Sequence, residues 1–358
     1  MMMEQTDEDW DAISDAELLQ IPLDDFSTDK SSQPHSSQSG KSQDMHNRTP
    51  ITSKSIHSYV PPPLRFFKRH LSVSLLCEQT WCEMKVQYGF LKPQIRKQEK
   101  KRTEVQTGAS IHLARELEVH DVVSVDVETP DDLVAVSLVN MLHMIHTLEA
   151  GKCVREFPVL GEVEGVFVKG VIDELSYNQK GELVLKELKT RRTASLPGSS
   201  QAVSHSLQVS LYKLLFDKLV RGEVKKEHIL QHLNLSASRT LGAAVRTQAA
   251  KVGVTTVTVG ELVDALLLTL ACSDLPCVDV LQLEYQHQSS SAIIGTVTPP
   301  FDETTLRKEV SVYLEYWTRQ REARGVDIEE AWKCLSCPYG EICEWRTNQA
   351  DVLQSEQQ

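Results

Sequence analysis

Apolar residues recur along the chain at two spacings, and the change between them divides the sequence. Residues 70–90, 107–120 and 131–151 carry apolar side chains at the three- and four-residue intervals of amphipathic helices. From residue 153 onward the chain becomes rich in Val and Phe and begins to alternate. This pattern predicts strands within 153–175 and at 183–191, joined by a short turn.

Helical spacing returns after these strands. It predicts helices at 204–220 and 304–324, with a late strand at 280–288. Thr107 stands where an N-cap would open the second of the early helices. Strands that are preceded and followed by helices predict an α/β fold, with a central mixed sheet flanked by helices and extra helical parts at both ends.

Composition separates three segments. Residues 1–63 are acidic and rich in Ser and Gln, which predicts a disordered tail. Residues 64–347 have a globular pattern and are predicted to form a single domain, and residues 348–358 are a short polar tail. Within the first segment, residues 9–21 place Trp10 and other apolar residues among acids. This stretch could fold as an amphipathic helix on a basic partner protein, or remain a solvated acidic tail.

The net charge of −12 over 358 residues looks unsuited to nucleic acid, but −8 of it lies in residues 1–50. The charge therefore excludes no ligand class for the folded part. No apolar run approaches the ~20 residues that cross a bilayer, and the acidic start lacks the features of a signal or transit peptide. We expect a soluble intracellular protein without a membrane partner, in the nucleus or cytoplasm, with the mitochondrion left open. Nothing suggests an obligate oligomer, so we expect a monomer.

Three charged residues end the predicted strands of the hairpin. Asp173 closes one apolar run, and Glu187 and Lys189 close the next. Alternate strand residues share a face, so Glu187 and Lys189 point the same way and a hairpin brings Asp173 to them. Two carboxylates beside an amine can hold Mg²⁺ or Mn²⁺, which activates water for attack on a phosphate, while the amine offsets negative charge. A surface salt bridge at the strand ends is the alternative.

Further motifs stand in a recognisable order around these residues. The D…ExK arrangement resembles the restriction-endonuclease-like PD-(D/E)xK core, and Gln208-x-x-x-Tyr212 after it is typical of the RecB-like branch of these nucleases. The resemblance implies that His112 is an additional metal ligand and that Gln208 and Tyr212 orient the lysine or a phosphate. A structural, partly buried histidine is the alternative for His112. Glu116, on the same helix face, stays open between a functional and a solvated acid.

Three cysteines lie close together near the C-terminus, at C-x2-C-x5-C spacing. Cys334, Cys337 and Cys343 can converge on one centre, and a reducing compartment favours metal ligands or free thiols over disulfides. A fourth ligand must come from elsewhere, with Cys82 favoured and Cys77 as the alternative. Four thiolates can hold Zn²⁺ or a [4Fe–4S] cluster. A zinc ribbon normally pairs two C-x-x-C knuckles, and the sequence has no second one.

The nuclease motifs and the cysteines together resemble the eukaryotic exonuclease V family over residues 65–347. The residues that carry the resemblance are Trp81-Cys82-Glu83, the block 170–189, SLQVSLYK at 206–213, SDLPCVDVLQLEY at 273–285 and the final cysteine motif. It implies a [4Fe–4S] cluster, held by the four cysteines including Cys82, that ties the two ends of the nuclease domain together. It also implies a Mg²⁺-dependent exonuclease that loads on a free end of single-stranded DNA and serves DNA repair. A flap endonuclease and a non-catalytic repair adaptor are the alternatives.

Two further features could contact DNA. Residues 96–102 and Arg191–Arg192 are basic and could line a path for the phosphate backbone. Tyr316 and Trp317 could stack on bases. Solvated surface is the alternative for the basic residues, and core packing is favoured for the two aromatic residues.

Overall fold

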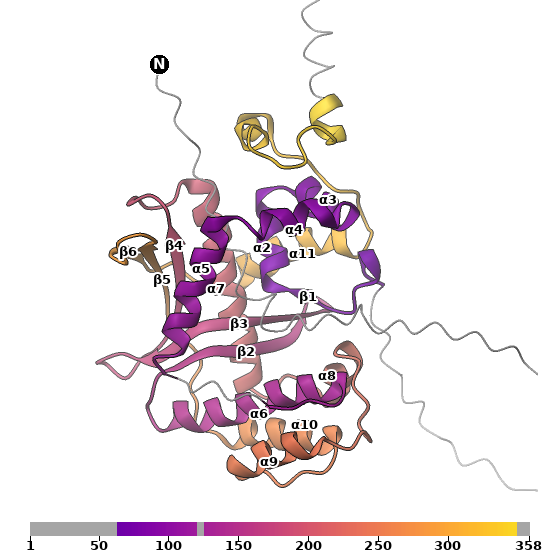
Figure 1. The fold of residues 1–358 in the computed structure, drawn as a ribbon, viewed down its shortest axis with the longest axis vertical. Coiled ribbons are helices and arrows are strands. Elements are labelled where there is room, and N and C mark those ends of the chain that lie inside the picture. Colours follow the sequence, from indigo (N-terminus) through magenta and orange to yellow (C-terminus); the bar gives the residue numbers. More distant parts are fainter. Residues whose placement is uncertain (1–62, 120–124, 349–358) are drawn as a thin grey trace, which may run out of the picture.

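The computed structural model describes residues 63–119 and 125–348, and a six-stranded mixed sheet lies at their centre (Figure 1). The hydrogen-bonded order is β1-β3-β4-β5-β6, and β2 also pairs with β3. The strands are β1 Leu71–Ser72, β2 Val154–Val163, β3 Val166–Tyr177, β4 Leu183–Arg191, β5 Val280–His287 and β6 Ile293–Val297. Pairs β1–β3 and β4–β5 are parallel and the others antiparallel. The predicted central mixed sheet flanked by helices is confirmed.

The two edges of β3 are paired differently. Strand β2 follows one edge from Val166 to Leu175. On the other edge, β1 pairs with Val168 and Lys169, while β4 pairs only from Glu174 to Tyr177. Residues 170–173 therefore lie between these two pairings, at the point where β3 and β4 diverge.

Helices cover the sheet and lie beyond it at both ends of the molecule (Figure 1). Their bounds are η2 Arg65–Phe67, α2 Val73–Trp81, α3 Glu83–Leu91, α4 Pro93–Glu99, α5 Thr103–Glu116, α6 Pro130–Glu149, α7 Ser199–Val220, α8 Lys226–His232, α9 Ala243–Lys251, α10 Val259–Cys272, α11 Glu303–Trp317 and η3 Ile328–Cys334. Helices α6 and α8–α10 gather at one end of the molecule, and α2–α4 with α11 gather toward the other. Helix α5 contacts β4.

Helix α7 is the central helix of the fold. It packs on β2, β3, β4 and β5 and also on α2, so most of its surface is buried. A helix that packs on several elements is expected to bury mostly apolar residues, and most of the buried residues of α7 are apolar. Two of its buried polar residues, Gln208 and Tyr212, mark the face of α7 that meets the candidate site.

The structure confirms the predicted bounds of one strand and corrects those of two helices. Strand β4 spans the predicted residues 183–191. The predicted helix at 70–90 is two helices, because Cys82 adopts an extended conformation between them. Thr107 is not an N-cap: α5 begins at Thr103, and the Thr107 hydroxyl donates to the carbonyl oxygen of Thr103 within the helix.

Some predictions fall outside the described residues. The predicted tails at 1–63 and 348–358 lie almost wholly outside them, as does the acidic segment 9–21. Within the described part of the chain, no helix combines the length and apolar character needed to cross a membrane.

Candidate active site and cysteine centre

The divergence of β3 and β4 centres on Asp173. The β3–β4 ladder stops at the pair Glu174–Lys186, and beyond it Asp173 Oδ2 accepts a hydrogen bond of 2.7 Å from the backbone N–H of Leu188. The side chain thus satisfies a backbone donor that the ladder leaves. Asp173 is only 6% exposed, and its Oδ1 has no hydrogen-bond partner among the described residues. A buried carboxylate oxygen in this state is suited to a cation.

A buried polar network lies on the α7 side of β4. Lys189 Nζ donates to Gln208 Oε1 at 2.9 Å and lies 3.2 Å from Glu187 Oε1. Gln208 Nε2 donates to Glu187 Oε1 and to the Tyr212 hydroxyl, both at 2.9 Å. A Cβ at Gly170 would lie 2.6 Å from the Tyr212 ring, so only glycine allows this packing. The network holds the lysine and the glutamate in a fixed mutual orientation.

Helix α5 brings His112 to the other side of Asp173. His112 Nδ1 lies 3.6 Å from Asp173 Oδ1. The helix is held over the sheet by Arg115, which donates to Glu284 of β5 at 2.5 Å. A Cβ at Gly108 would lie 3.0 Å from a side-chain oxygen of β4, so this glycine permits the close approach of the helix. The Gly108, His112 and Glu116 face of α5 is therefore turned toward the site.

Glu156 of β2 joins this group, and the sequence analysis did not identify it. One ligand atom each from Glu156, His112 and Asp173 lie within 4.8 Å of one another. In the β2–β3 ladder Glu156 stands opposite Asp173, because the residues on either side of both are paired. The register of that hairpin is the signal that could have found it, and the pattern over 153–175 did not divide the segment into two strands.

Charged residues beside this group neutralise one another. Lys186 Nζ and Arg155 Nε donate to the two oxygens of Glu174 at 2.5 and 3.0 Å. Burial alone would raise the pKa of Glu174, but these hydrogen bonds prevail and lower it. Glu116 lines the same pocket but is not one of the three converging residues. The pocket thus combines one neutralised acid with a separate pair of carboxylates near an imidazole.

The predicted site residues therefore form two groups in the structure. Glu187, Lys189, Gln208 and Tyr212 belong to the buried network against α7, whereas His112 groups with Asp173 and Glu156 in the pocket under α5. The hydrogen bond from the Leu188 backbone to Asp173 connects β4 to the pocket group.

The four cysteines predicted as ligands line a single pocket. Cys82 lies between α2 and α3, and it meets Cys334, Cys337 and Cys343 from the C-terminal segment. Cys77, the alternative fourth ligand, is instead packed in the main apolar core. The structure thus brings together Cys82 rather than Cys77 with the C-terminal motif.

Cys343 in this pocket is buried, the other three cysteines are half-buried, and their thiols influence one another. Burial, followed by the neighbouring cysteines, raises the pKa of Cys82 to about 11. Sulfurs around one tetrahedral zinc lie about 3.8 Å apart, as follows from a Zn–S bond of about 2.3 Å. Among the described residues, these sulfurs are absent from the sets of three ligand atoms that converge within 4.8 Å.

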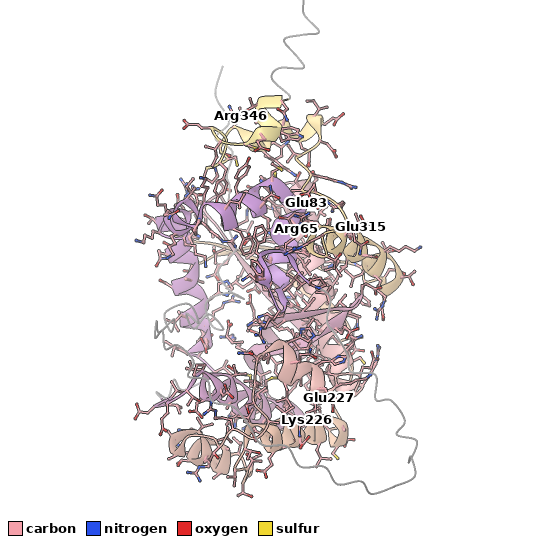
Figure 2. All side chains as sticks on the ribbon, turned by 90° about the vertical axis from the view of Figure 1, so that its right-hand side faces the viewer. Arg65, Glu83, Lys226, Glu227, Glu315 and Arg346 are labelled. Carbon is pink, nitrogen blue, oxygen red and sulfur yellow. The ribbon has the colours of Figure 1, made fainter. Side chains whose placement is uncertain are left out.

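Glu83 fastens the C-terminal segment beside Cys82. Its two oxygens accept hydrogen bonds of 2.5 Å from the guanidinium of Arg321, and Oε2 also accepts from the backbone N–H of Arg324 at 2.8 Å. Burial would raise the pKa of Glu83, but the hydrogen bonds lower it. Figure 2 shows Glu83 between the body of the molecule and the end at which Arg346 lies. This contact carries the chain toward the cysteine pocket.

The residues that were candidates for DNA contact differ in how far they are buried. Arg191 is buried and donates to a backbone carbonyl, so its placement on a surface path is wrong. Arg192 is half exposed and pairs with an acid of α5. Tyr316 and Trp317 are fully buried, which confirms the favoured core packing and rules out base stacking. The basic residues 96–102 overlap the second half of α4. None of them is buried, so they remain candidates for contact with DNA.

Comparison with known proteins places this geometry in a family. A family model described as "Exonuclease V - a 5' deoxyribonuclease" matches residues 63–184, 178–264 and 254–346. A Danio rerio protein named Exonuclease V is 54% identical over 372 residues, covering 96% of this chain and 94% of its own. The crystal structure of a protein designated SSO0001 is 15% identical, matches 78% of this chain and 87% of its own, and has a TM-score of 0.40. The family match spans nearly all of the described chain, and the chain belongs to the exonuclease V family.

Proposed function

We propose that this protein is a DNA exonuclease that hydrolyses single-stranded DNA from a free 5′ end and acts in DNA repair. The observation that carries the proposal is the buried carboxylate of Asp173, set between His112 and the network of Lys189, in a chain of this family. The 5′ direction rests on the description of the matching family model. We propose that the central sheet and its flanking helices form a PD-(D/E)xK nuclease core.

The proposed cofactor of the reaction is Mg²⁺ or Mn²⁺. The residues fit such an ion, because Asp173 Oδ1 is buried without a hydrogen-bond partner among the described residues and faces an imidazole nitrogen. Asp173 and His112 would hold the ion, with Glu187 as a further carboxylate. A divalent cation there supplies an activated water and stabilises the charge that develops on the phosphate.

Lys189 is the proposed charge-stabilising or water-positioning group. Gln208 and Glu187 orient its ammonium, and Tyr212 fixes the amide of Gln208. An ammonium that is already oriented needs no rearrangement as negative charge develops on the phosphate. Lys189 is buried and His112 is partly exposed, so a phosphate approaching under α5 meets His112 first.

The proposed second cofactor is a [4Fe–4S] cluster held by Cys82, Cys334, Cys337 and Cys343. The convergence of four cysteines in one pocket supports such a centre, and the lack of a second C-x-x-C knuckle favours a cluster over a zinc ribbon. Its role is structural, because hydrolysis of a phosphodiester moves no electron. It would join the α2–α3 junction to the C-terminal segment.

The proposal extends to partners and location. We propose that the acidic segment around Trp10 docks on a basic surface of a repair protein. The enzyme would act as a monomer in the nucleus or cytoplasm, with the mitochondrion still open.

A comparison of linear and circular DNA tests the proposed function. Protein purified without oxygen, to keep a cluster intact, is incubated with Mg²⁺ and either end-labelled linear single strands or a circular single strand. We expect the linear strand to disappear and the circle to survive, and a block on the 5′ end to protect the linear strand. Cutting of both would favour a flap-type endonuclease, and cutting of neither would favour the non-catalytic adaptor.

A further inference from the structure

We propose that Glu156 is the third ligand of the cation in this active site, beside His112 and Asp173. This inference rests on the proposed function and deepens it by naming a ligand that the strand motif D…ExK does not contain. The three side chains come from β2, β3 and α5, and one ligand atom of each lies within 4.8 Å of the other two.

The strand pairing directs Glu156 to this place. It stands opposite Asp173 in the β2–β3 ladder, where the pairing is interrupted for these two residues alone between Arg155 and Phe157. Its backbone has φ +55°, in the left-handed region that a non-glycine residue in a strand rarely adopts. Such a conformation costs energy and is found where function requires a particular side-chain direction. The strain is accounted for if it aims the carboxylate at Asp173 and His112.

The second observation is the state of Asp173. Its side chain is 6% exposed, and its Oδ1 is without a hydrogen-bond partner among the described residues while facing His112 Nδ1 at 3.6 Å. Ligand atoms of one Mg²⁺ lie about 3.0 Å apart when adjacent and about 4.2 Å apart when opposite, since each bond is about 2.1 Å long and the geometry is octahedral. The three residues therefore need only a small side-chain adjustment to close on one ion.

Glu174, the acid next to Asp173 in the sequence, is excluded as a cation ligand because its carboxylate already has two partners. Glu174 also borders the pocket, but Lys186 and Arg155 occupy both of its oxygens. Glu174 is therefore not a candidate ligand, whereas Glu156 and Asp173 converge with His112.

The donor set predicts which cation binds best. Two carboxylates suit Mg²⁺ and Mn²⁺ alike, whereas an imidazole nitrogen suits transition metals better than Mg²⁺. The site should therefore bind Mn²⁺ more tightly than Mg²⁺.

Mn²⁺ titration of the full chain tests the ligand assignment without using activity. Free Mn²⁺ gives a sharp paramagnetic resonance signal that disappears on binding, which yields the dissociation constant. We expect Glu156→Gln and Asp173→Asn each to raise it by at least about tenfold, since even partners outside the ligand shell change metal affinity by about 10–100-fold. The matched control is Glu162→Gln, from the same strand, whose carboxylate pairs with His228 instead.

A second variant guards against a folding defect. Glycine adopts φ +55° without strain, so metal-free Glu156→Gly should melt at or above the wild-type temperature and lose the rise that Mn²⁺ produces. If both Glu156 variants bind Mn²⁺ like the wild type while Asp173→Asn does not, the role of Glu156 is wrong and the proposed function stands. If the wild-type protein binds no Mn²⁺, the metal site of the proposed function fails as well.

Discussion

Asp173 is the residue at which the two buried groups of the candidate site meet. One of its oxygens bonds to the backbone of β4, beside Glu187 and Lys189, and the other faces His112. Strand alternation placed Glu187 and Lys189 on one face, and the order of the nuclease-like motifs was needed to group Asp173 with them. Strand alternation could not select Glu156, because that residue is reached only through the register of β2 against β3 and a left-handed backbone angle, and neither is encoded in residue spacing.

The first prediction at this scale concerns Lys189. Replacing it with Met should reduce cleavage at least about 100-fold, because the oriented positive charge is lost. The same change leaves Glu187 buried without its cation and should lower the free energy of unfolding by about 3 kcal/mol. Urea unfolding and a DNA cleavage assay measure the two effects.

The double variant Lys189→Met/Glu187→Gln separates them. Removing both charges should restore much of the stability while cleavage stays lost. Wild-type cleavage by Lys189→Met would remove this residue from the mechanism.

Helix α5 and the β3–β4 hairpin are the elements that assemble the site. The hairpin was predictable, because its strands are long and apolar and a turn separates them. Helices α8 and α9, at 7 and 9 residues, were not, because two turns give too few apolar repeats to show a period. The break at Cys82 could not be predicted, because the apolar spacing continues across it although its backbone is extended.

The attachment of α5 gives the second prediction. Arg115→Met should loosen the helix, because the 2.5 Å contact with Glu284 holds it to the sheet. Loss of about 1 kcal/mol corresponds to about a fivefold faster hydrogen exchange of the α5 amides, together with weaker Mn²⁺ binding. Arg192→Met is the control, because Arg192 pairs with the same helix but is half exposed. Equal effects of the two variants would contradict a special role for Arg115.

The entry to β1 gives a pH-dependent prediction. Burial, then the positive charge of Lys169, lowers the pKa of His70 to about 4, and its Nδ1 bonds to the backbone oxygen of His232. Below pH 6.5 the unfolded chain binds a proton that the folded chain resists, so stability should fall as the pH drops from 6.5 toward 4, by about 1–3 kcal/mol.

Unfolding measured across this range checks the assignment. His70→Asn keeps a donor for His232 but does not titrate, and it should flatten the dependence. Some slope should remain, because burial also lowers the pKa of His232. An unchanged slope in His70→Asn would assign the effect to other groups.

At the scale of the whole molecule, the chain is joined end to end. Cys82 near the start of the described residues meets three cysteines near their end, and the contacts of Glu83 with Arg321 and Arg324 guide the C-terminal segment there. The close spacing of the C-terminal cysteines predicted a shared centre. The sequence favoured Cys82 over Cys77 but left both open, and the fold separates them, because Cys77 lies in the core and Cys82, just after α2, lies in the pocket.

The cysteine centre gives the prediction at this scale. Cys343→Ser should lose the iron and sulfide of the proposed cluster and lower the melting temperature, because the link between the chain ends is broken. Cys77→Ala should keep both iron and sulfide, since Cys77 packs in the apolar core. Chemical iron analysis and thermal unfolding measure the outcome. Iron loss in Cys77→Ala at an intact fold would reverse the assignment of the fourth ligand.

The proposed function depends most directly on Asp173 of β3, whose carboxylate would hold the cation for DNA hydrolysis. The most direct test compares wild type and Asp173→Asn, both with intact iron content, on 5′-labelled single-stranded DNA with Mn²⁺. We expect the variant to fold and to lose cleavage by at least about 100-fold, because the buried oxygen that faces His112 can no longer hold a cation. Cleavage by Asp173→Asn at the wild-type rate would show that the chemistry lies elsewhere in the molecule.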